Sequence, residues 1–286
     1  MSLRLEHVSY IYEPGTPMEK KALEDVSLRV EKGEILAVIG ATGSGKSTLI
    51  QLMNGLNKPS EGKVYFNDTD IFSENYSRKA LRSKVGLVFQ YPEYQLFETD
   101  VLKDICFGPK NLGLPEEECL ARARKAMREV GLDEDYEKES PFDLSGGEKR
   151  RVAIAGVLAM EPEILILDEP AAGLDPEGKR EILKKLNTLR DEQGIGIVLV
   201  SHSMEDVAQL ADRVIVLEKG RILTQGTARE VFARREMLHT TGLALPVMSR
   251  LWEKLQEKGF PVSGQALSVY EAKDKILEVL REKGHV

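Results

Sequence analysis

Short aliphatic runs with almost no polar alternation recur along the chain and predict buried strands. They lie at 35–39, 85–89, 164–167 and 197–200. Strands with this composition are typical of a parallel sheet that helices cover on both faces. Longer segments of helical character fall between them, at 46–56, 115–130, 148–160 and 177–192. The alternation of the two kinds of segment predicts an open α/β sheet.

Other segments extend this core at both ends. Residues 3–8 and 22–28 alternate and predict an antiparallel β subdomain. Residues 214–217 and 221–224 flank Lys219-Gly220 and predict a hairpin that closes the main domain. We therefore expect one large domain over 1–227, with a smaller part after it.

The pattern changes from about residue 228. Ala272, Ile276, Val279 and Leu280 share one helical face, and Leu251, Trp252 and Leu255 suggest a second helix. These segments predict a small helical appendage over 228–286. Simple packing on the core and a role in dimerisation both remain open for it.

Composition narrows the class of protein. The 286 residues are 42% hydrophobic and 30% charged, which is typical of a globular chain. Apolar runs stay well below the roughly 18–20 residues of a membrane helix, and the N-terminus lacks the apolar core of a signal peptide. We therefore expect a cytosolic chain whose membrane role, if any, comes through a partner.

The remaining bulk features exclude other classes. Cys106 and Cys119 predict reduced thiols and neither a metal nor a disulfide site. The formal net charge of −7 argues against a nucleic-acid partner. The basic cluster at 149–151 is too short to reverse this expectation.

A phosphate-binding loop follows the first predicted buried strand and opens a predicted helix. Its glycines let backbone N–H groups turn inward around phosphate oxygens, and the helix N-terminus adds a positive end. The loop pattern also predicts that its lysine reaches the β- and γ-phosphates and that its last serine ligates Mg²⁺. The residues are Gly40, Ala41, Thr42, Gly43, Ser44, Gly45, Lys46 and Ser47.

Two acids end a second buried strand. Asp168 stands where a carboxylate can hold the same Mg²⁺ as Ser47. The adjacent Glu169 can orient or deprotonate an attacking water. Together with the loop, this pair predicts nucleotide triphosphate hydrolysis.

Further motifs narrow the family. Leu144-Ser145-Gly146-Gly147-Glu148 resembles the signature of ABC ATPases. The other parts stand in the family's order: Gln90 resembles the Q-loop glutamine, 172–175 the D-loop and His202 the switch histidine. The resemblance covers about residues 3–226. It implies an ABC cassette of the P-loop NTPase fold, with a parallel-sheet core, an antiparallel β subdomain and a helical subdomain at about 91–160.

The resemblance also implies a role for each motif. Catalysis falls to Lys46, Gln90, Glu169 and His202, and Mg²⁺ binding to Ser47, Gln90 and Asp168. Nucleotide binding extends from residues 40–47 to Thr48 and to Tyr12, the aromatic expected on adenine, with Tyr10 as the alternative. The signature residues Ser145, Gly146, Gly147 and Glu148 would contact ATP held by an opposite subunit, with Asp175 in the D-loop. Because the chain contains one cassette, a second one is implied.

Two positions depart from the usual family pattern. Glu148 stands where Gln is more usual, and Ala171 where Thr or Ser is more usual. An acid in the first turn suits the helix dipole but disfavours a nearby γ-phosphate. We expect these changes to tune affinity for ATP, since the Walker acids and His202 are intact.

The segment around the Q-loop resembles a narrower group. Residues 89–97 (FQYPEYQLF) and 104–113 (DICFGPKNLG) are similar to the ATPases of energy-coupling factor (ECF) transporters, which import vitamins and transition-metal ions. The form PEYQLF is closer to the second of the two paired ATPases, called A′. The helical tail fits the same group.

Membership of this group would imply several partners. They are a sister ATPase, a transmembrane T protein whose coupling helices dock near the Q-loop, and interchangeable substrate-binding S proteins. Because the family's coupling helices carry arginines, Glu93, Glu98 and Asp104 are candidates for the acidic side of that contact. Solvated surface acids are the alternative for these three residues. The resemblance also implies a peripheral position on the cytoplasmic face of the membrane.

Three other functions remain as alternatives. An ATPase acting on nucleic acid or ribosomes tends to carry two cassettes or a long coiled-coil insertion. A non-hydrolysing scaffold is disfavoured by the intact Lys46, Asp168, Glu169 and His202. The third alternative is an ABC cassette that serves a different importer or exporter, and only the Q-loop segment and the tail argue against it.

Overall fold

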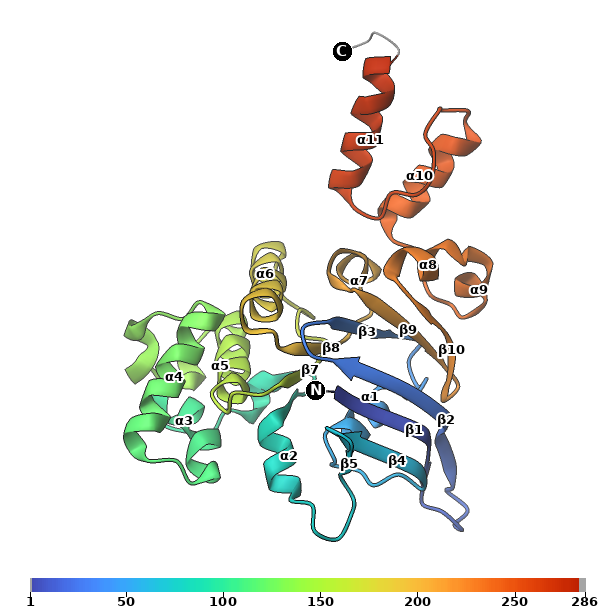
Figure 1. The fold of residues 1–286 in the computed structure, drawn as a ribbon. Coiled ribbons are helices and arrows are strands. Elements are labelled where there is room, and N and C mark those ends of the chain that lie inside the picture. The colour runs from blue at the N-terminus through green and yellow to red at the C-terminus, as the bar shows by residue number, and fades with distance from the viewer. Residues whose placement is uncertain (1, 283–286) are drawn as a thin grey trace.

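The computed structural model describes residues 2–282, which form two sheets with helices around them. Figure 1 shows the two sheets at the centre, a group of helices to one side and two further helices projecting beyond the sheets. Within the described residues, no helix is both long and apolar enough to cross a membrane.

The central sheet has six strands in the order β10-β9-β3-β8-β7-β6. Strands β3, β6, β7, β8 and β9 are parallel to one another. Strand β10 runs antiparallel to β9, as the predicted hairpin requires. Every residue of β3, β7 and β8 is buried, which explains the lack of polar alternation in these strands. The bounds are β3 (Ile35–Ile39), β6 (Val85–Val88), β7 (Ile164–Asp168), β8 (Gly196–Val200), β9 (Arg213–Glu218) and β10 (Arg221–Gly226).

The second sheet is antiparallel, in the order β2-β1-β4-β5. It confirms the two strands predicted near the N-terminus and makes both longer. The other two strands were not predicted, because β4 begins with three exposed residues and β5 has only two residues. The bounds are β1 (Ser2–Tyr12), β2 (Lys20–Glu31), β4 (Glu61–Phe66) and β5 (Thr69–Asp70).

Helix α1 (Lys46–Met53) joins the two sheets into one core. Its buried Leu49 and Met53 belong to a hydrophobic cluster that also holds Leu5 of β1 and Val38 of β3. The helix is shorter than the predicted 46–56. It ends where Asn54 caps it, and Gly55 then turns the chain with φ 69°.

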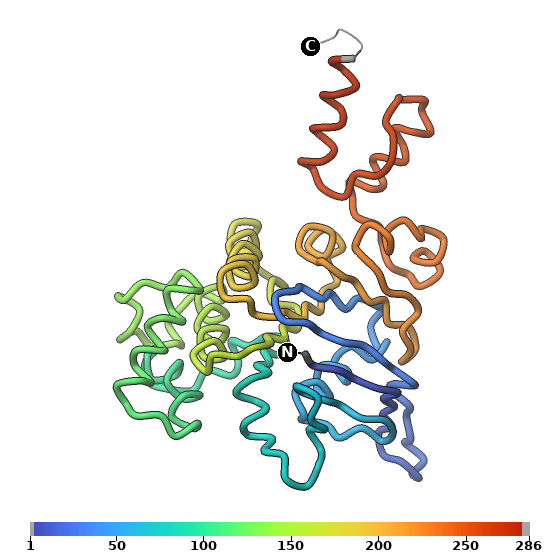
Figure 2. Tube along the Cα trace, in the orientation of Figure 1, coloured from blue at the N-terminus to red at the C-terminus, as the bar shows by residue number. Residues whose placement is uncertain are grey.

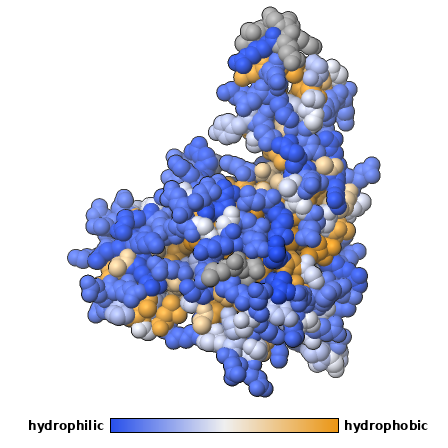
Figure 3. Space-filling model, in the orientation of Figure 1, coloured by the Kyte–Doolittle hydropathy of each residue, from blue (hydrophilic) through white to orange (hydrophobic). Residues whose placement is uncertain are grey.

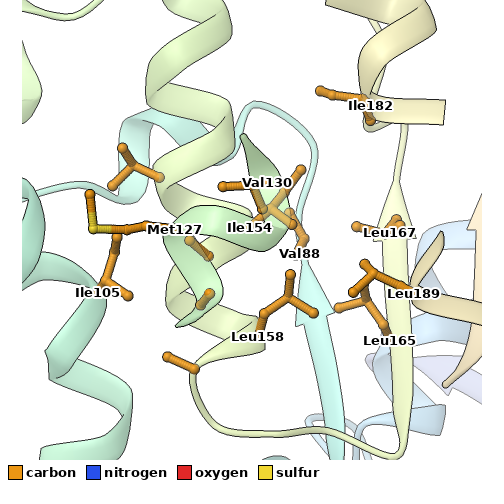
Figure 4. Close-up of a cluster of buried hydrophobic side chains, with 14 of the residues drawn as sticks. Val88, Ile105, Met127, Val130, Ile154, Leu158, Leu165, Leu167, Ile182 and Leu189 are labelled. Atoms are coloured by element: carbon orange, nitrogen blue, oxygen red, sulfur yellow. The ribbon is translucent and has the colours of Figure 1, made fainter. Parts of the chain in front are cut away.

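Three helices form a group beside the central sheet: α3 (Val101–Leu112), α4 (Glu116–Val130) and α5 (Gly146–Leu158). Their apolar side chains meet those of β6 and β7 in the cluster of Figure 4, which includes Ile105, Met127 and Ile154. Helix α3 was not predicted, because Gly108 and Pro109 interrupt its pattern. Its first turn is nevertheless capped by Asp100, whose side chain accepts the N–H of Lys103.

Helices and short helical turns connect these parts. Helix α6 confirms the segment predicted at 177–192 and is one residue longer at each end. The short α2 and α7 were not predicted, since seven residues give too little periodicity. The bounds are α2 (Arg78–Lys84), η1 (Pro92–Gln95), η2 (Glu134–Lys138), η3 (Pro141–Asp143), α6 (Pro176–Gln193) and α7 (Met204–Leu210).

The last four helices divide into two pairs. Phe232 of α8 (Ala228–Ala233) and Leu238 of α9 (Arg235–Thr240) share a cluster with Ala37 and Val214 of the central sheet. In contrast, α10 (Val247–Glu257) and α11 (Val269–Glu282) pack around Trp252 in a small cluster of their own. The trace in Figure 2 shows this second pair standing beyond the rest of the chain. The division of the chain into a main domain over 1–227 and an appendage over 228–286 stays a prediction. Met1 and residues 283–286, which belong to these two segments, lie outside the described residues.

Candidate nucleotide site

The register of the parallel strands brings four motifs to one edge of the sheet. Asp168 pairs with Val200, which in turn pairs with Val38, while Val88 pairs with Leu167. The carboxyl ends of four strands therefore lie at the same level. The residues that follow them form a common site, as expected for an open α/β sheet.

The phosphate-binding loop is held tightly against the neighbouring backbone. A Cβ added at Gly40 would lie 2.3 Å from the carbonyl oxygen of Leu217, and one at Gly45 would lie 2.7 Å from that of Ala22. Both glycines also have positive φ, 158° and 108°. A side chain at either position would push the loop out of place, which explains the glycines.

Lys46 begins α1 and is 7% exposed. Its Nζ donates to the carbonyl oxygens of Gly40 at 2.7 Å and Ala41 at 3.1 Å. Burial lowers the pKa of Lys46, and the nearby Glu169 and Asp168 carboxylates oppose that shift. The ammonium group thus stands inside the loop, where its charge is available to a phosphate.

The residues predicted to hold Mg²⁺ come together in one pocket. Ser47, Gln90 and Asp168 line a pocket of about 280 Å³ with Lys46 and Glu169. Burial raises the pKa of Asp168, while Lys46 and a hydrogen bond with Ser47 lower it. A carboxylate, a hydroxyl and an amide oxygen are hard donors that fit Mg²⁺, with phosphate oxygens and water completing its shell.

Glu169 follows β7 directly and has a left-handed backbone with φ 54°. Its N–H donates to the carbonyl oxygen of Val200 at 3.0 Å. Burial, and then the neighbouring Asp168 carboxylate, raise the pKa of Glu169 to about 7, although Lys46 opposes the shift. Its Oε1 is buried without a hydrogen-bond partner among residues 2–282. These features suit a general base that acts on water.

His202 follows β8 and faces the same carboxylate. Its Nε2 lies 3.6 Å from Oε1 of Glu169, and the imidazole is half exposed. Burial, and secondly the charge of Lys46, lower the pKa of His202. The side chain is therefore mainly neutral at pH 7 and can donate one hydrogen bond into the pocket.

Tyr12 stands at the mouth of the pocket, 38% exposed. Its hydroxyl is 3.0 Å from Oγ1 of Thr48, and its ring meets the ring of Tyr10 edge to face at 4.8 Å. Tyr10 packs against the core between the sheets. Tyr12 therefore lines the pocket, and the ring of Tyr10 packs against the ring of Tyr12 from the core side. Of the remaining predicted residues, Thr42, Gly43 and Thr48 line the pocket, and Gly40, Ala41 and Ser44 lie in the loop around it.

Three of the four predicted signature residues, Ser145, Gly146 and Gly147, line a second pocket of about 360 Å³, and Glu148 is not among its lining residues. Ser145 caps α5, and Glu148 closes a capping box by accepting the N–H of Ser145 at 2.8 Å. The hydroxyl of Tyr136 donates to the other oxygen of Glu148 at 2.8 Å, and these bonds lower the pKa of Glu148. Asp175 lines the same pocket and caps α6. Among the described residues, the signature pocket and the phosphate pocket share no lining residue.

The three acids predicted for partner contact have different surroundings. Glu93 accepts two bonds from the guanidinium group of Arg150, at 3.2 and 3.3 Å. Asp104 accepts the N–H groups of Phe97 and Glu98, both at 2.9 Å. Two of the three carboxylates thus already have partners inside the chain, and neither is a simple solvated acid.

Sequence reasoning missed Arg150. Its side chain is 4% exposed, and its guanidinium group donates both to Glu93 in the Q-loop segment and to the carbonyl oxygen of Ala172 in the D-loop. A signal existed: Arg150 lies four and eight residues before Ile154 and Leu158, so it falls on the apolar face of α5. From sequence, the basic cluster at 149–151 was weighed only as a possible nucleic-acid signal, and no role inside the chain was predicted for Arg150.

Comparison with known proteins places this geometry in a family. A model described as ABC transporter matches residues 23–172. An energy-coupling factor transporter ATP-binding protein (EcfA2) of Caldanaerobacter subterraneus is 53% identical over 281 residues, 98% of both chains. A protein of the same name from Clostridium tetani is 53% identical over 284 residues, 99% of both chains. The chain belongs to the ABC transporter ATPases, in the energy-coupling factor group. The predicted resemblance, including its A′ type, is confirmed.

Solved structures agree with this family and confirm the fold of this ABC ATPase. A structure of cbiO1 from Clostridium perfringens, part of the ABC transporter complex cbiONQ, has a TM-score of 0.74 and 41% identity. It matches 88% of this chain and 98% of its own. A dimeric post-hydrolysis structure of the cassette MJ0796 with ADP and Pi has a TM-score of 0.69 and 29% identity, over 79% and 98% of the two chains. Binding and hydrolysis of ATP follow from the family.

Proposed function

We propose that this ABC ATPase hydrolyses ATP with Mg²⁺ between two head-to-tail cassettes and so energises an ECF importer of vitamins or transition-metal ions. The observation that carries the proposal is the meeting of Lys46, Asp168, Glu169 and His202 at one sheet edge. The relatives named above support the transporter class.

The chain's own residues have distinct tasks in binding. Backbone N–H groups of the loop and the Lys46 ammonium hold the β- and γ-phosphates. The ring of Tyr12 stacks on adenine. Ser47, Gln90 and Asp168 hold Mg²⁺, which when bound offsets charge on the phosphates.

Hydrolysis transfers the γ-phosphoryl group to water. Glu169 orients the water and accepts its proton, so that a new P–O bond forms as the bond to the β-phosphate oxygen breaks. A base with a pKa of about 7 is ionised in a large part of the molecules at neutral pH and still basic enough to take the proton. His202 donates a hydrogen bond to the γ-phosphate and stabilises the charge that develops there.

A second cassette completes each site. Ser145 and the N–H groups of Gly146 and Gly147 form an anion-binding helix start. They line a pocket apart from the phosphate loop of their own chain, which supports contact with ATP on the opposite cassette. A sister ATPase or a second copy of this chain fits this role, with Asp175 beside the same interface.

A groove beside the Q-loop segment is our proposed docking site for the T protein. Its volume is about 520 Å³, and it lies between α2, α3 and α5. Phe97 and Phe107 line it with their rings 4.8 Å apart and are half exposed. Figure 3 shows apolar residues gathered at the surface on this helical side of the molecule. Of the three predicted acids, Asp104 lines the groove, Glu98 follows the lining residue Phe97 in sequence, and Glu93 lines the signature pocket instead.

These contacts would hold the chain as a peripheral subunit on the cytoplasmic face of the membrane. Substrate choice would then belong to S proteins bound to the T protein. The same ATPase could serve several S proteins, because nothing in the proposed nucleotide site depends on the cargo.

Affinity purification from the native membrane tests the proposal. The tagged chain is extracted in mild detergent and its partners are identified by mass spectrometry. We expect a second ABC ATPase, a T-type membrane protein and one or more S proteins. Recovery with ribosomes or DNA-processing proteins and no membrane protein would overturn the transport function.

A further inference from the structure

Arg150 joins three segments that lie far apart in the sequence. It lies on α5, one turn after the signature glycine Gly146. Its Nη2 donates to both carboxylate oxygens of Glu93 in η1. Its Nη1 donates to the carbonyl oxygens of Pro170, at 3.3 Å, and Ala172. One side chain thus connects the signature helix, the Q-loop segment and the start of the D-loop.

The burial of this side chain makes the connection stiff. The side chain of Arg150 is 4% exposed, and that of Glu93 is 18% exposed. Ile154 and Leu158, one and two turns further along α5, belong to the buried cluster drawn in Figure 4. A charge removed from water is stable only while its partners stay in place, so the three segments cannot separate freely.

The two segments that Arg150 connects, around Glu93 and around Pro170, lie next to the proposed docking groove and the proposed catalytic base. The Glu93 segment continues into Gln95 and Phe97, which line the proposed docking groove. The Pro170 segment begins directly after Glu169. Tyr91 and Glu169, each the residue before a proline, have left-handed backbones with φ 56° and 54°. Such a conformation persists only where surrounding contacts enforce it, and the bonds of Arg150 are such contacts.

We propose that Arg150 is a positioning residue that couples occupancy of the groove to the placement of Glu169 and the signature helix. The proposal rests on the proposed function, since it takes the groove to bind a membrane subunit. A partner that moves η1 would pull on Arg150 through Glu93. Movement of Arg150 would then shift the carbonyl groups of Pro170 and Ala172, and with Pro170 the adjacent Glu169, which orients the water.

Only an arginine fits this arrangement. Its planar group presents several N–H donors in fixed directions, which serve a carboxylate on one side and two carbonyls on the other. A lysine at this position keeps the charge and can pair with Glu93. Its single ammonium cannot span the carboxylate and both carbonyls at once. Arg150→Lys therefore keeps the ion pair with Glu93 and removes the connection among the three segments, so it distinguishes the effects of the two.

The test compares variants in the purified membrane complex. We would measure ATP hydrolysis for Arg150→Lys and Arg150→Gln, and thermal stability for each. The control is Arg124→Gln, which removes a two-pronged pair with Glu137 in the same group of helices. Hydrogen exchange of the amides at 171–175 would be followed with and without the membrane subunits.

For Arg150→Lys we expect KM for ATP within about 2-fold of wild type and kcat reduced by about 10- to 100-fold, as for a catalytic group displaced by a fraction of an ångström to 1 Å. Binding of the membrane subunits should change exchange at 171–175 in the wild type and the control. In Arg150→Lys it should change exchange only near Glu93.

Two results would overturn the coupling. One is wild-type kcat and wild-type exchange in Arg150→Lys. The other is a parallel loss of kcat, ATP affinity and thermal stability, which would make Arg150 a purely structural residue. If the wild-type complex contains no membrane subunit, the proposed function fails and takes the coupling with it. Failure of Arg150→Lys alone to change kcat leaves the ATP site and the transporter assignment intact.

Discussion

The Nε2 atom of His202 lies 3.6 Å from Oε1 of Glu169 across the mouth of the phosphate pocket. This distance is too long for a hydrogen bond and leaves room for both side chains to turn toward a substrate. The two residues follow neighbouring strands, and the parallel pairing of β7 with β8 sets their separation. The chain therefore presents a base and a hydrogen-bond donor side by side in one pocket.

Replacing His202 by alanine should reduce kcat while ATP binding stays close to normal. Loss of one donor to the charge that develops in the transition state costs about 10²- to 10³-fold in kcat. Steady-state kinetics of the purified complex would measure this. His239→Ala, in the exposed part of α9, is the matched control and should keep wild-type kcat. A His202→Ala complex with unchanged kcat would remove His202 from catalysis.

Glu169→Gln should stabilise the nucleotide-free fold at alkaline pH. Burial raises the pKa of Glu169 from 4.5 to about 7, so between these values the folded protein holds a proton that the unfolded chain has released. Raising the pH through this window therefore lowers the free energy of unfolding. The glutamine variant avoids this penalty, so its free energy of unfolding at pH 8 should exceed that of the wild type by about 3 kcal/mol.

Urea unfolding of the two nucleotide-free proteins across this pH range would measure the difference. The gap should shrink toward zero as the pH falls well below 4.5, where the carboxyl is protonated in both states. A difference in the free energy of unfolding that does not depend on pH would mean that burial does not raise the pKa of Glu169.

Tyr12→Ala should weaken ATP binding, and Tyr12→Phe should not. Stacking of a base on an aromatic ring contributes about 1–3 kcal/mol, so KM for ATP should rise by about 5-fold or more in the alanine variant. The phenylalanine variant loses only the hydroxyl contact with Thr48. Should Tyr10→Ala raise KM more than Tyr12→Ala in an equally stable protein, the adenine position belongs to Tyr10.

Glu148→Gln should strengthen the apparent affinity for ATP. The carboxylate closes the capping box of the signature helix and adds a negative charge one residue after Gly147, which lines the pocket proposed for a γ-phosphate. An effect of about 0.5–1 kcal/mol at a helix start corresponds to a KM about 2- to 5-fold lower. Glu134→Gln removes an exposed acid from the same group of helices and serves as the control. An increased KM would mean that the capping box matters more than the charge.

The sequence predicted the central sheet and the nucleotide site well, for a physical reason. Strands buried on both faces, such as 35–39 and 164–167, leave an uninterrupted aliphatic signal. The glycines of the phosphate loop and the acids after β7 stand at fixed places relative to those strands. Their meeting then follows from parallel pairing alone.

Other features depended on contacts that no local pattern records. Helix α3 contains Gly108 and Pro109, and Gly108 is required because a Cβ there would lie 2.9 Å from Cγ of Met160. The burial of Arg150 depends on Glu93, which lies 57 residues away in sequence. The division of the tail into a pair that packs on the sheet and a pair around Trp252 also comes from tertiary packing.

Hydrolysis of bound ATP in a single turnover by Glu169→Gln in the purified complex tests the central claim most directly. Glu163→Gln is the control, because it removes a carboxylate just before the same strand, β7. We predict that the Glu169→Gln complex retains unhydrolysed ATP with the cassettes closed, and that its turnover is slower by about 10²- to 10⁴-fold. Turnover at the wild-type rate, with ADP accumulating at the normal pace, would contradict the account.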